Sequence, residues 1–373
     1  MKILIITPTS WQITNFRSYL IKLLQKNNHD ISVITFDSKH KEEIIDNNIK
    51  FYFVPDNNRS KNPFRILTLK AKLLKKINII KPDVVLTFML KPNTYGVLAA
   101  KKAGTKRIYS VVEGAGDVFV NQSVLWKLIR IYVQHLYKKS FVNNHKVFFL
   151  NKDDRQEFID RKIVNITKTD IIHGIGVDTN KFNYEPIKND SVFLMVARML
   201  RNKGVYEYLE CARIVKKMYP NVVFNYVGGE GDIGYSDIRE YIEDGSIIYY
   251  GYTNDVKRFY ADSTVFVLPS YREGFPVSIM EAQSTGRMVI TTKTNGCKET
   301  VIDGHNGFLI EKCNTNSLVD KVLWCVNNKD KVKKMGDKAR IFAENNFNEN
   351  KVNSEFLEKL RFDTINRSEE DYD

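Results

Sequence analysis

Short apolar runs alternate along the chain with longer stretches in which apolar residues recur at every third or fourth position. The first two runs are residues 2–7 and 31–36, and a stretch with helical periodicity, residues 15–26, lies between them. Runs this short and rich in β-branched residues are typical of strands buried in a parallel sheet. Strands that alternate with helices predict a doubly wound parallel α/β fold. Further strands of this series are expected at 51–55, 83–88, 108–112, 147–150 and 170–173, and further helices at 63–76, 94–103 and 124–137.

A second series of the same kind begins after the polar stretch 184–190. Two series in 373 residues predict two domains of ordinary size. We expect an N-terminal domain at 1–168, a C-terminal domain at 169–347, and a last segment at 348–373 with a helix that returns to the N-terminal domain and an acidic tail. The second series is expected to have strands at 192–196, 222–227, 247–250, 264–268 and 288–291, and helices at 205–218, 318–326 and 331–345.

The segment LPSYREGFPVSIMEAQSTGRMVI, residues 268–290, joins two of these strands through a loop and a helix. Pro276 suits the first helical position, because proline lacks the N–H that would be unpaired there. Glu273 lies in the loop at the carboxyl end of a strand, where open α/β sheets bind ligands. Glu281 shares a partly apolar helix face with Val277 and Ser278, so its carboxylate needs a hydrogen-bonding partner. Paired ligand hydroxyls such as those of a ribose could be that partner, although a salt-bridged surface helix would show the same spacing.

Two cations bracket the turn in MVARMLRNKGV, residues 195–205, which follows the first strand of the second series. Arg198 and Lys203 at the mouth of the sheet could hold a diphosphate and stabilise it as a leaving group. Two solvated loop cations are the ordinary alternative. Gly228 and Gly229 follow another strand and permit a ligand to approach the backbone closely, but a glycine pair alone is a weak signal. No Walker or dinucleotide-binding glycine motif is present.

Basic residues are concentrated in the first part of the chain. Residues 1–150 hold 25 Lys and Arg against 9 Asp and Glu, a net charge of +16, whereas residues 151–373 hold 32 against 35, a net of −3. Such asymmetry indicates an anionic partner, which could be a membrane surface, a polyphosphate or a nucleic acid, and a solvated basic face is the alternative. Basic amphipathic helices are compatible with an anionic membrane surface, where outward-facing aromatics could enter the interface. The candidates are Phe64, Trp126 and Tyr132.

Neither a metal site nor a disulfide framework is indicated. The four cysteines form no C-x-x-C pair, the six histidines form no close pair, and no Asp-x-Asp of the kind that holds Mg²⁺ on a nucleotide sugar is present. We therefore expect no cofactor and no metal, with any diphosphate neutralised by Arg198, Lys203 and backbone N–H groups. No apolar stretch approaches roughly 18 residues and the first residues lack a signal-peptide pattern, so a cytoplasmic protein is expected.

Taken together, these segments resemble the family 4 retaining glycosyltransferases of the GT-B fold. In the family's order and spacing, the resemblance is carried by VARMLRNKGV, YVGGEGD, YGYTNDV, VFVLPSYREGFPVSIMEAQSTGR, NGCKETV and DGHNGFLI, which cover most of residues 190–312. It implies two Rossmann-like, doubly wound parallel-sheet domains that face each other across a cleft. The C-terminal domain would bind a UDP-sugar, and the N-terminal domain would face the acceptor and the membrane.

A closer likeness is to bacterial enzymes that act on sugars linked to undecaprenyl diphosphate, among them the N-acetylgalactosaminyltransferase of N-glycosylation and O-antigen relatives. This likeness has shorter matches, at residues 62–64, 93–101 and 112–119. It implies retaining transfer of a hexose or N-acetylhexosamine (GalNAc, GlcNAc or Gal) from a UDP-sugar to a lipid-linked saccharide, in the assembly of an O-antigen, a capsule or a glycoprotein. The enzyme would lie peripherally on the anionic inner face of the cytoplasmic membrane.

The family resemblance also implies a role for each matching position. The departing diphosphate would accept the proton of the acceptor hydroxyl, so the protein would position the substrates and stabilise the leaving group without a nucleophile of its own. By position, Arg198 and Lys203 would hold the diphosphate, and the helix N–H groups of Val277 and Ser278 would lie near it. Glu273 would face the transferred sugar, with further backbone contacts from Gly274, Phe275 and Pro276, and Glu281 would bind the ribose. Tyr252 and Thr253 would lie by the uracil, and Gly228 and Gly229 would line the pocket.

The sequence departs from the family pattern at two places on the acceptor side. Many relatives carry a histidine after the strand that ends at Val112, where this chain has Glu113. The glycine pair that many relatives have after the first strand is replaced by TPTSWQITNF. The candidates for positioning the acceptor are therefore Glu113, Asp117 and Asn15.

Three other functions are compatible with parts of this pattern. A transferase of the same fold could use a soluble acceptor, and a UDP-sugar 2-epimerase or hydrolase would consume the donor without an acceptor. A non-enzymatic nucleic-acid-binding protein would account for the basic first part, but no recognisable DNA- or RNA-binding motif is present, so no nucleic acid is expected.

Overall fold

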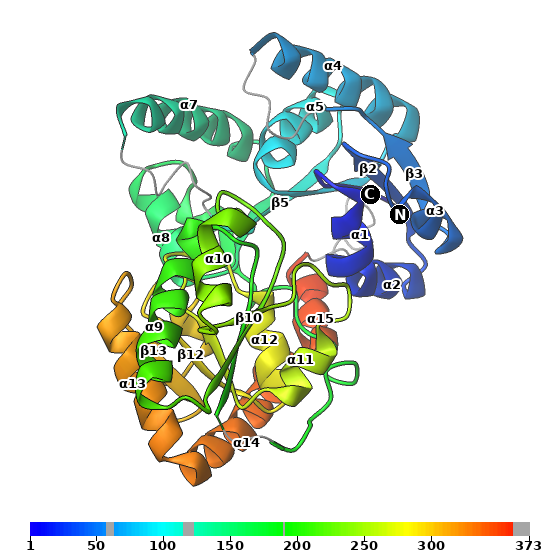
Figure 1. The fold of residues 1–373 in the computed structure, drawn as a ribbon. Coiled ribbons are helices and arrows are strands. Elements are labelled where there is room, and N and C mark those ends of the chain that lie inside the picture. Colours follow the sequence, from blue (N-terminus) through cyan, green and yellow to red (C-terminus); the bar gives the residue numbers. More distant parts are fainter. Residues whose placement is uncertain (57–62, 115–122, 189–190, 361–373) are drawn as a thin grey trace. The chain divides into compact units, whose positions relative to one another are not determined.

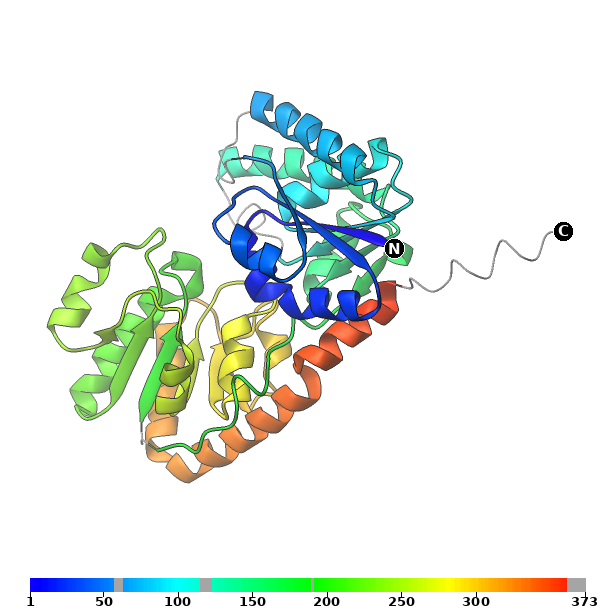
Figure 2. The same cartoon turned by 90° about the vertical axis from the view of Figure 1, so that its right-hand side faces the viewer.

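The computed structural model describes residues 1–56, 63–114, 123–188 and 191–360. The chain divides into two compact units, one formed by Met1–Ile175 with Val352–Asp373 and the other by Gly176–Lys351. Each unit has one parallel sheet with helices packed on it, as the ribbon in Figure 1 and its turned view in Figure 2 show. The predicted fold of two Rossmann-like, doubly wound domains is confirmed.

The sheet of the first unit has the strand order β3-β2-β1-β4-β5-β6-β7. The order reverses at β1, where Ile3 pairs in parallel with Ile31 on one side and with Val84 on the other. Open α/β sheets bind ligands at the carboxyl ends of the strands beside such a reversal. The strands are β1 (Lys2–Ile6), β2 (Asp30–Thr35), β3 (Lys50–Phe53), β4 (Val84–Phe88), β5 (Arg107–Val112), β6 (Lys146–Phe149) and β7 (Thr169–Ile171).

Helices cover both faces of this sheet. Leu73 of α4 and Val97 of α5 pack in one core with Leu4 of β1, whereas Phe356 of α15 packs edge-on against Phe148 of β6 on the other face, with ring centroids 4.9 Å apart. The helices are α1 (Ser10–Phe16), α2 (Ser18–Lys26), α3 (Lys41–Asp46), α4 (Pro63–Ile80), the π-helix η1 (Pro92–Gly96), α5 (Val97–Lys102), α7 (Val124–Phe141), α8 (Lys152–Asp160), the 3-10 turn η2 (Ile166–Lys168) and α15 (Glu349–Leu360).

Three predicted boundaries in this unit differ from the structure. The single helix expected at 15–26 is two helices, because the backbone of Arg17 leaves the helical region between α1 and α2, with φ −121° and ψ −2°. The helix expected at 94–103 starts earlier, as the π-helix η1. The first unit continues past residue 168 to Ile175, because β7 pairs with β6. It also includes the chain from Val352 onward, which begins within α15.

The second unit has a six-stranded sheet with the order β10-β9-β8-β11-β12-β13. Its central strands β11 and β12 are buried along their whole length, as their β-branched composition predicts. The strands are β8 (Val192–Val196), β9 (Val223–Val227), β10 (Ile248–Tyr249), β11 (Val265–Leu268), β12 (Met288–Thr292) and β13 (Gly307–Ile310). The helices are α9 (Val205–Met218), α10 (Tyr235–Glu243), α11 (Lys257–Asp262), α12 (Val277–Ser284), α13 (Thr315–Asn327) and α14 (Lys329–Asn346), with 3-10 turns η3 (Arg201–Lys203) and η4 (Lys298–Thr300).

The position of Pro276 is a further correction. It precedes α12 as the N-cap residue with an extended ψ of 113°, and the helix begins at Val277. Proline at the N-cap still costs no hydrogen bond, because the first N–H groups of a helix have no partner within it.

Candidate active site

The loops after β8 and β11 are packed against each other at the carboxyl edge of the second sheet. Gly204 has φ +75° and lies so close to the Pro269 carbonyl that a Cβ atom there would overlap it. The carbonyl of Asn202 accepts hydrogen bonds from the Ser270 hydroxyl (3.0 Å) and from the Tyr271 N–H (2.8 Å). Glycine at 204 therefore permits a close contact that fixes one loop on the other.

The loop after β12 packs on the same segment from its other side. Gly296 has φ +79°, and a Cβ atom there would overlap the carbonyls of Glu273 and Gly274. The Glu273 N–H donates to the carbonyl of Asn295 at 3.0 Å. Three strand ends thus hold the backbone of Glu273 in one place.

Lys203 and Glu273, both predicted from the sequence, form an ion pair at this edge. The Lys203 Nζ lies 2.5 Å from Glu273 Oε1, and the Ser270 hydroxyl, whose one proton is shared between this oxygen and the Asn202 carbonyl, lies 2.7 Å from it. The side chains keep 25% and 11% of their surface exposed, so the pair is reachable from solvent. A cation and an oriented carboxylate therefore meet where an α/β sheet binds its ligand.

Arg198 lies two residues beyond β8 and is exposed. Its guanidinium pairs with no carboxylate in the described part of the chain. An exposed cation at the carboxyl edge of the sheet can accept an anion without first giving up a protein partner. Its convergence with Lys203 on one diphosphate stays a prediction.

Glu281 has a partner that the sequence pattern did not indicate. The Tyr260 hydroxyl, from α11, donates to Glu281 Oε2 at 2.8 Å, so the surface salt bridge considered as the alternative is not what satisfies it. Burial raises the pKa of Glu281 to about 7, against the opposing effects of the Tyr260 hydrogen bond and the charge of Lys181. The pKa of the Tyr260 hydroxyl is raised well above its ordinary value by the same burial. Tyr260 was missed because no pattern marks the short helix α11.

The first turn of α12 presents backbone donors at this edge. Val277 and Ser278 are half-buried at the start of the helix, where N–H groups have no acceptor within the helix and favour a negative charge. Phe275 is buried, and its ring packs edge-on against Phe347 with centroids 5.4 Å apart. The side chain of Phe275 therefore anchors the loop, and only its backbone and that of Gly274 could contact a ligand.

The glycine pair after β9 and the predicted base-binding segment lie together. The Gly228 N–H donates to the Gly251 carbonyl at 2.9 Å. The Tyr252 side chain lies beside Gly229, with its Cβ 3.6 Å from the point where a Cβ atom of residue 229 would be. Tyr252 is 69% exposed, and the Thr253 hydroxyl oxygen accepts the Asp255 N–H at 3.1 Å in a tight turn. An exposed aromatic ring beside unhindered backbone offers a surface on which a base could stack.

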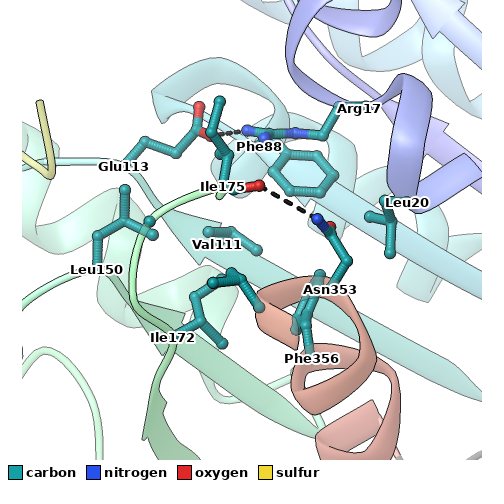
Figure 3. Close-up of a pocket in the computed structure, with 12 residues that line it drawn as sticks. Arg17, Leu20, Phe88, Val111, Glu113, Leu150, Ile172, Ile175, Asn353 and Phe356 are labelled. Atoms are coloured by element: carbon teal, nitrogen blue, oxygen red, sulfur yellow. Dashed lines mark hydrogen bonds and ion pairs between the residues drawn. The ribbon is translucent and has the colours of Figure 1, made fainter. Parts of the chain in front are cut away.

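In the first unit, Glu113 follows β5 and forms an ion pair with Arg17, a residue that the sequence did not single out (Figure 3). The guanidinium carbon of Arg17 lies 4.1 Å from the centroid of the Phe88 ring, and its Nη1 donates to the Phe16 carbonyl at 3.0 Å. Burial lowers the pKa of Arg17 to about 9, so it remains a cation at neutral pH. Arg17 was missed because it was interpreted as one position of a continuous helix, whereas it ends α1.

The other two acceptor-side candidates contribute less to this arrangement. The Asn15 amide is exposed and donates to the Trp11 carbonyl and the Thr14 hydroxyl of its own helix. Asp117 lies outside the described residues.

In the part of the chain that the structure describes, no three His, Cys, Asp or Glu side chains gather as a metal site would require. The four cysteines are free, with Cys313 exposed and the other three buried. None of the described helices is long and apolar enough to cross a bilayer.

Two family models match the chain, one in each unit. The family of group 1 glycosyl transferases matches residues 177–342, and the glycosyl transferase 4-like family matches residues 2–143. Together these matches cover most of the two described sheets.

The chain is similar over its length to curated relatives and solved structures. It is 29% identical over 339 residues to the N,N'-diacetylbacillosaminyl-diphospho-undecaprenol alpha-1,3-N-acetylgalactosaminyltransferase of Campylobacter jejuni, covering 86% of this chain and 88% of the relative. It is 28% identical to the UDP-Gal:alpha-D-GlcNAc-diphosphoundecaprenol alpha-1,3-galactosyltransferase of Escherichia coli, with 83% of each covered. A glycosyltransferase of Rickettsia africae superposes with a TM-score of 0.78 at 22% identity, over 98% of this chain and 99% of that one. The Anabaena HepE protein, solved with UDP and glucose, has a TM-score of 0.77 at 19% identity, over 96% and 99%.

Proposed function

The chain belongs to the glycosyltransferases with a 4-like N-terminal domain and a group 1 C-terminal domain, and on this premise we propose that it moves a hexose or N-acetylhexosamine from a UDP-sugar to a saccharide linked to undecaprenyl diphosphate. The transfer would retain the anomeric configuration and serve the assembly of a bacterial surface glycan. Two relatives that span more than four-fifths of the chain carry names of this kind, with N-acetylgalactosamine and galactose as the sugars.

The observation that carries the donor site is the Lys203–Glu273 pair beside the N-terminus of α12. A cation, two free helix N–H groups and the exposed Arg198 supply positive charge for a diphosphate, and Glu273 supplies an acceptor for sugar hydroxyls. Glu281, with one carboxylate oxygen on Tyr260, would accept from the ribose hydroxyls. The uracil would stack by Tyr252.

In this mechanism the protein lowers the barrier by positioning and by stabilising the leaving group. As the bond to the transferred sugar breaks, negative charge grows on the diphosphate, where Lys203 and Arg198 stabilise it. The same diphosphate takes the proton of the acceptor hydroxyl as that oxygen bonds to the sugar. Glu113 would orient the hydroxyl. We propose that no metal is needed, since these cations and N–H groups do the neutralisation that Mg²⁺ would otherwise do.

The direct test is a panel of UDP-sugars incubated with undecaprenyl-diphosphate-linked saccharides, with the products identified by mass spectrometry and the new linkage by NMR. One donor should give an acceptor that is heavier by one sugar in the retained configuration, in the presence of EDTA as in its absence. Consumption of the UDP-sugar at the same rate without acceptor would instead indicate a hydrolase or an epimerase.

The affinity for a UDP-sugar is expected to rise with pH. Because the pKa of Glu281 is raised to about 7, the carboxylate that accepts the ribose hydroxyls is mostly protonated at pH 6 and mostly ionised at pH 8. A site that is competent only when ionised then gains about tenfold in affinity between these values. Isothermal titration with an intact UDP-sugar, whose diphosphate does not titrate in this range, measures the change. Glu281→Gln should bind more weakly and with no slope, and an equal slope in this variant would show that another group titrates.

Docking on an anionic membrane is proposed for the face of α7. Leu128 and Ile131 are 62% and 63% exposed one turn apart, Tyr132 is 48% exposed beside them, and the exposed Lys127 and Lys138 lie on the same helix. Apolar side chains rimmed by lysines fit the interface of an anionic leaflet, where each well-placed cation contributes about 1 kcal/mol. Trp126 is half-buried, and the side chain of Phe64 lies outside the described residues.

In flotation with vesicles that contain anionic lipids, Ile131→Asp is expected to reduce the bound fraction several-fold, because it puts a like charge into the apolar contact. Ile341→Asp is the matched control, since Ile341 is similarly exposed at 57% on α14 of the other unit. Equal binding to neutral and anionic vesicles would contradict the electrostatic part of this proposal.

A further inference from the structure

We propose that Arg17 is a positioning residue, which holds the Glu113 carboxylate ionised and in one orientation so that it can accept a hydrogen bond from the acceptor hydroxyl. This inference rests on the proposed transferase function, and it concerns the first unit only. Arg17 would not touch the substrate, since its effect passes through Glu113.

The two residues meet in a pocket that is otherwise almost entirely apolar (Figure 3). Its wall includes the residues at the carboxyl ends of successive strands, with Phe88 from β4, Val111 from β5 and Leu150 beyond β6. Leu20 of α2, Phe356 of α15 and the residues Ile172, Gly174 and Ile175 complete it, with Asn353 as the neutral polar member. Among the described residues that line the pocket, Arg17 and Glu113 are the charged ones, so the guanidinium is the charge next to the Glu113 carboxylate.

Arg17 is held more tightly than a surface arginine. It is 3% exposed, and its guanidinium stacks on the Phe88 ring. Its Nη1 donates a hydrogen bond to the Phe16 carbonyl, and its Nη2 forms the ion pair with Glu113. Its Nε is buried without a hydrogen-bond partner in the described residues. These contacts fix the plane of the guanidinium and therefore the direction from which Glu113 is held.

A buried ion pair is a poor way to stabilise a fold, because desolvation of the charges offsets much of their attraction. An apolar pair would fill the same pocket at a lower cost. The retention of two charges and an unsatisfied Nε at the carboxyl edge of the sheet therefore favours a role in function. The backbone of Met89, directly after Phe88, supports the same conclusion. Met89 is a bulky residue with φ +71° and is 41% exposed, and backbone strain of this kind is concentrated at functional sites.

The charge of Arg17 decides what Glu113 can do. A carboxylate in an apolar pocket takes up a proton readily, and a carboxyl group that carries a proton donates a hydrogen bond, whereas the acceptor hydroxyl needs a group that accepts one. The nearby guanidinium favours the ionised form, because an opposite charge at this distance stabilises a carboxylate. Glu113 keeps 10% of its side chain exposed while Oε1 is paired with Arg17. Its second oxygen, Oε2, is the one assigned to the acceptor hydroxyl.

The test compares Arg17→Met, Glu113→Gln and the double variant with the full-length protein. Lys146→Met is the matched control, because Lys146 forms an ion pair with Asp170 (3.2 Å) at the opposite, amino end of β6 in the same sheet. We would measure kcat/KM for the lipid-linked acceptor from pH 5.5 to 9, the affinity for the UDP-sugar, and the titration of the Glu113 carboxyl carbon by ¹³C NMR, assigned by its loss in Glu113→Gln.

Arg17→Met is expected to lower kcat/KM for the acceptor at least tenfold at pH 7 and to move the acid limb of the pH profile up by about 1 unit or more. The NMR titration of Glu113 should move with it, the UDP-sugar affinity should not change, and Arg17→Lys should restore part of the activity. The double variant should be no less active than Glu113→Gln. Lys146→Met should leave the profile unchanged.

The proposal is overturned if Arg17→Met lowers thermal stability but leaves both the acid limb and the Glu113 titration where they are in the wild type. A wild-type protein that glycosylates no lipid-linked acceptor would instead contradict the proposed function. In that case the NMR titration still decides whether Arg17 controls the ionisation of Glu113, so the two failures are distinguishable.

Discussion

Replacing Lys203 with alanine is expected to lower kcat by about 10²–10³-fold, the cost of removing one group that stabilises charge in the transition state. The Lys203 ammonium lies at the carboxyl edge of the second sheet, where charge would grow on the departing diphosphate. Its loss would also leave Glu273, which is 11% exposed, without its counter-ion and close to that negative charge. Arg198→Ala should have an effect of the same order, because it removes the other cation of the proposed site.

Arg201→Ala is the control for both variants. Arg201 is an exposed cation in the same turn, but its guanidinium lies over the Tyr206 ring at 5.4 Å, whereas the ion pair of Glu273 is with Lys203. Steady-state kinetics with the correct donor and acceptor should show near-normal turnover for Arg201→Ala. Near-normal kcat in Lys203→Ala or Arg198→Ala would show that the leaving group is stabilised elsewhere.

Gly204→Ala is expected to destabilise the second unit by about 2–4 kcal/mol, as a left-handed backbone and an overlap with the Pro269 carbonyl add together. Gly245→Ala separates these two effects, because Gly245 has nearly the same φ, +73° against +75°, with nothing near its Cβ position. It should cost only about 1 kcal/mol.

Thermal denaturation followed by circular dichroism and calorimetry measures the difference between the two variants. At about 2–4 °C per kcal/mol for a unit of this size, Gly204→Ala should melt several degrees below Gly245→Ala. It should also bind the UDP-sugar more weakly, because the loop that carries Lys203 can no longer rest on the loop that carries Glu273. Equal melting temperatures would mean that the two loops can separate without cost.

The fold was readable from the sequence because buried parallel strands leave a strong signal. The largely apolar runs that form β1, β4, β11 and β12 are buried on both faces apart from the first residue of β1, and a run of this kind admits few other structures. Elements with weaker patterns were missed, such as α3, α10 and α11, and the strand β13, which begins at a glycine. The predicted end of the first domain, residue 168, lies before β7. The three residues of β7 form a strand because they pair with β6, and their own sequence gives little strand propensity.

Some residues of the candidate site could be predicted from the sequence and others could not. Lys203 and Glu273 were found because each lies in the loop that follows a strand, β8 or β11, and the carboxyl ends of parallel strands meet at one edge of a sheet. Tyr260 and Arg17 could not be found in this way. Tyr260 reaches Glu281 from 21 positions earlier in the chain, and Arg17 reaches Glu113 from 96 positions earlier, so their partners are set by tertiary packing alone.

The return of α15 to the first unit has a consequence for the order in which the protein is made. The first sheet is complete at β7, yet two residues on one of its faces are covered only by α15, near the end of the chain. The Tyr109 hydroxyl donates to the Leu360 carbonyl at 2.8 Å, 251 positions later, and Phe356 packs on Phe148. During synthesis, this apolar face of the first sheet therefore stays exposed to solvent until the whole second unit and α15 have been made. A fragment ending at Ile175 should expose that face and aggregate, and a chain in which 352–360 is joined to it through a short linker should stay monomeric.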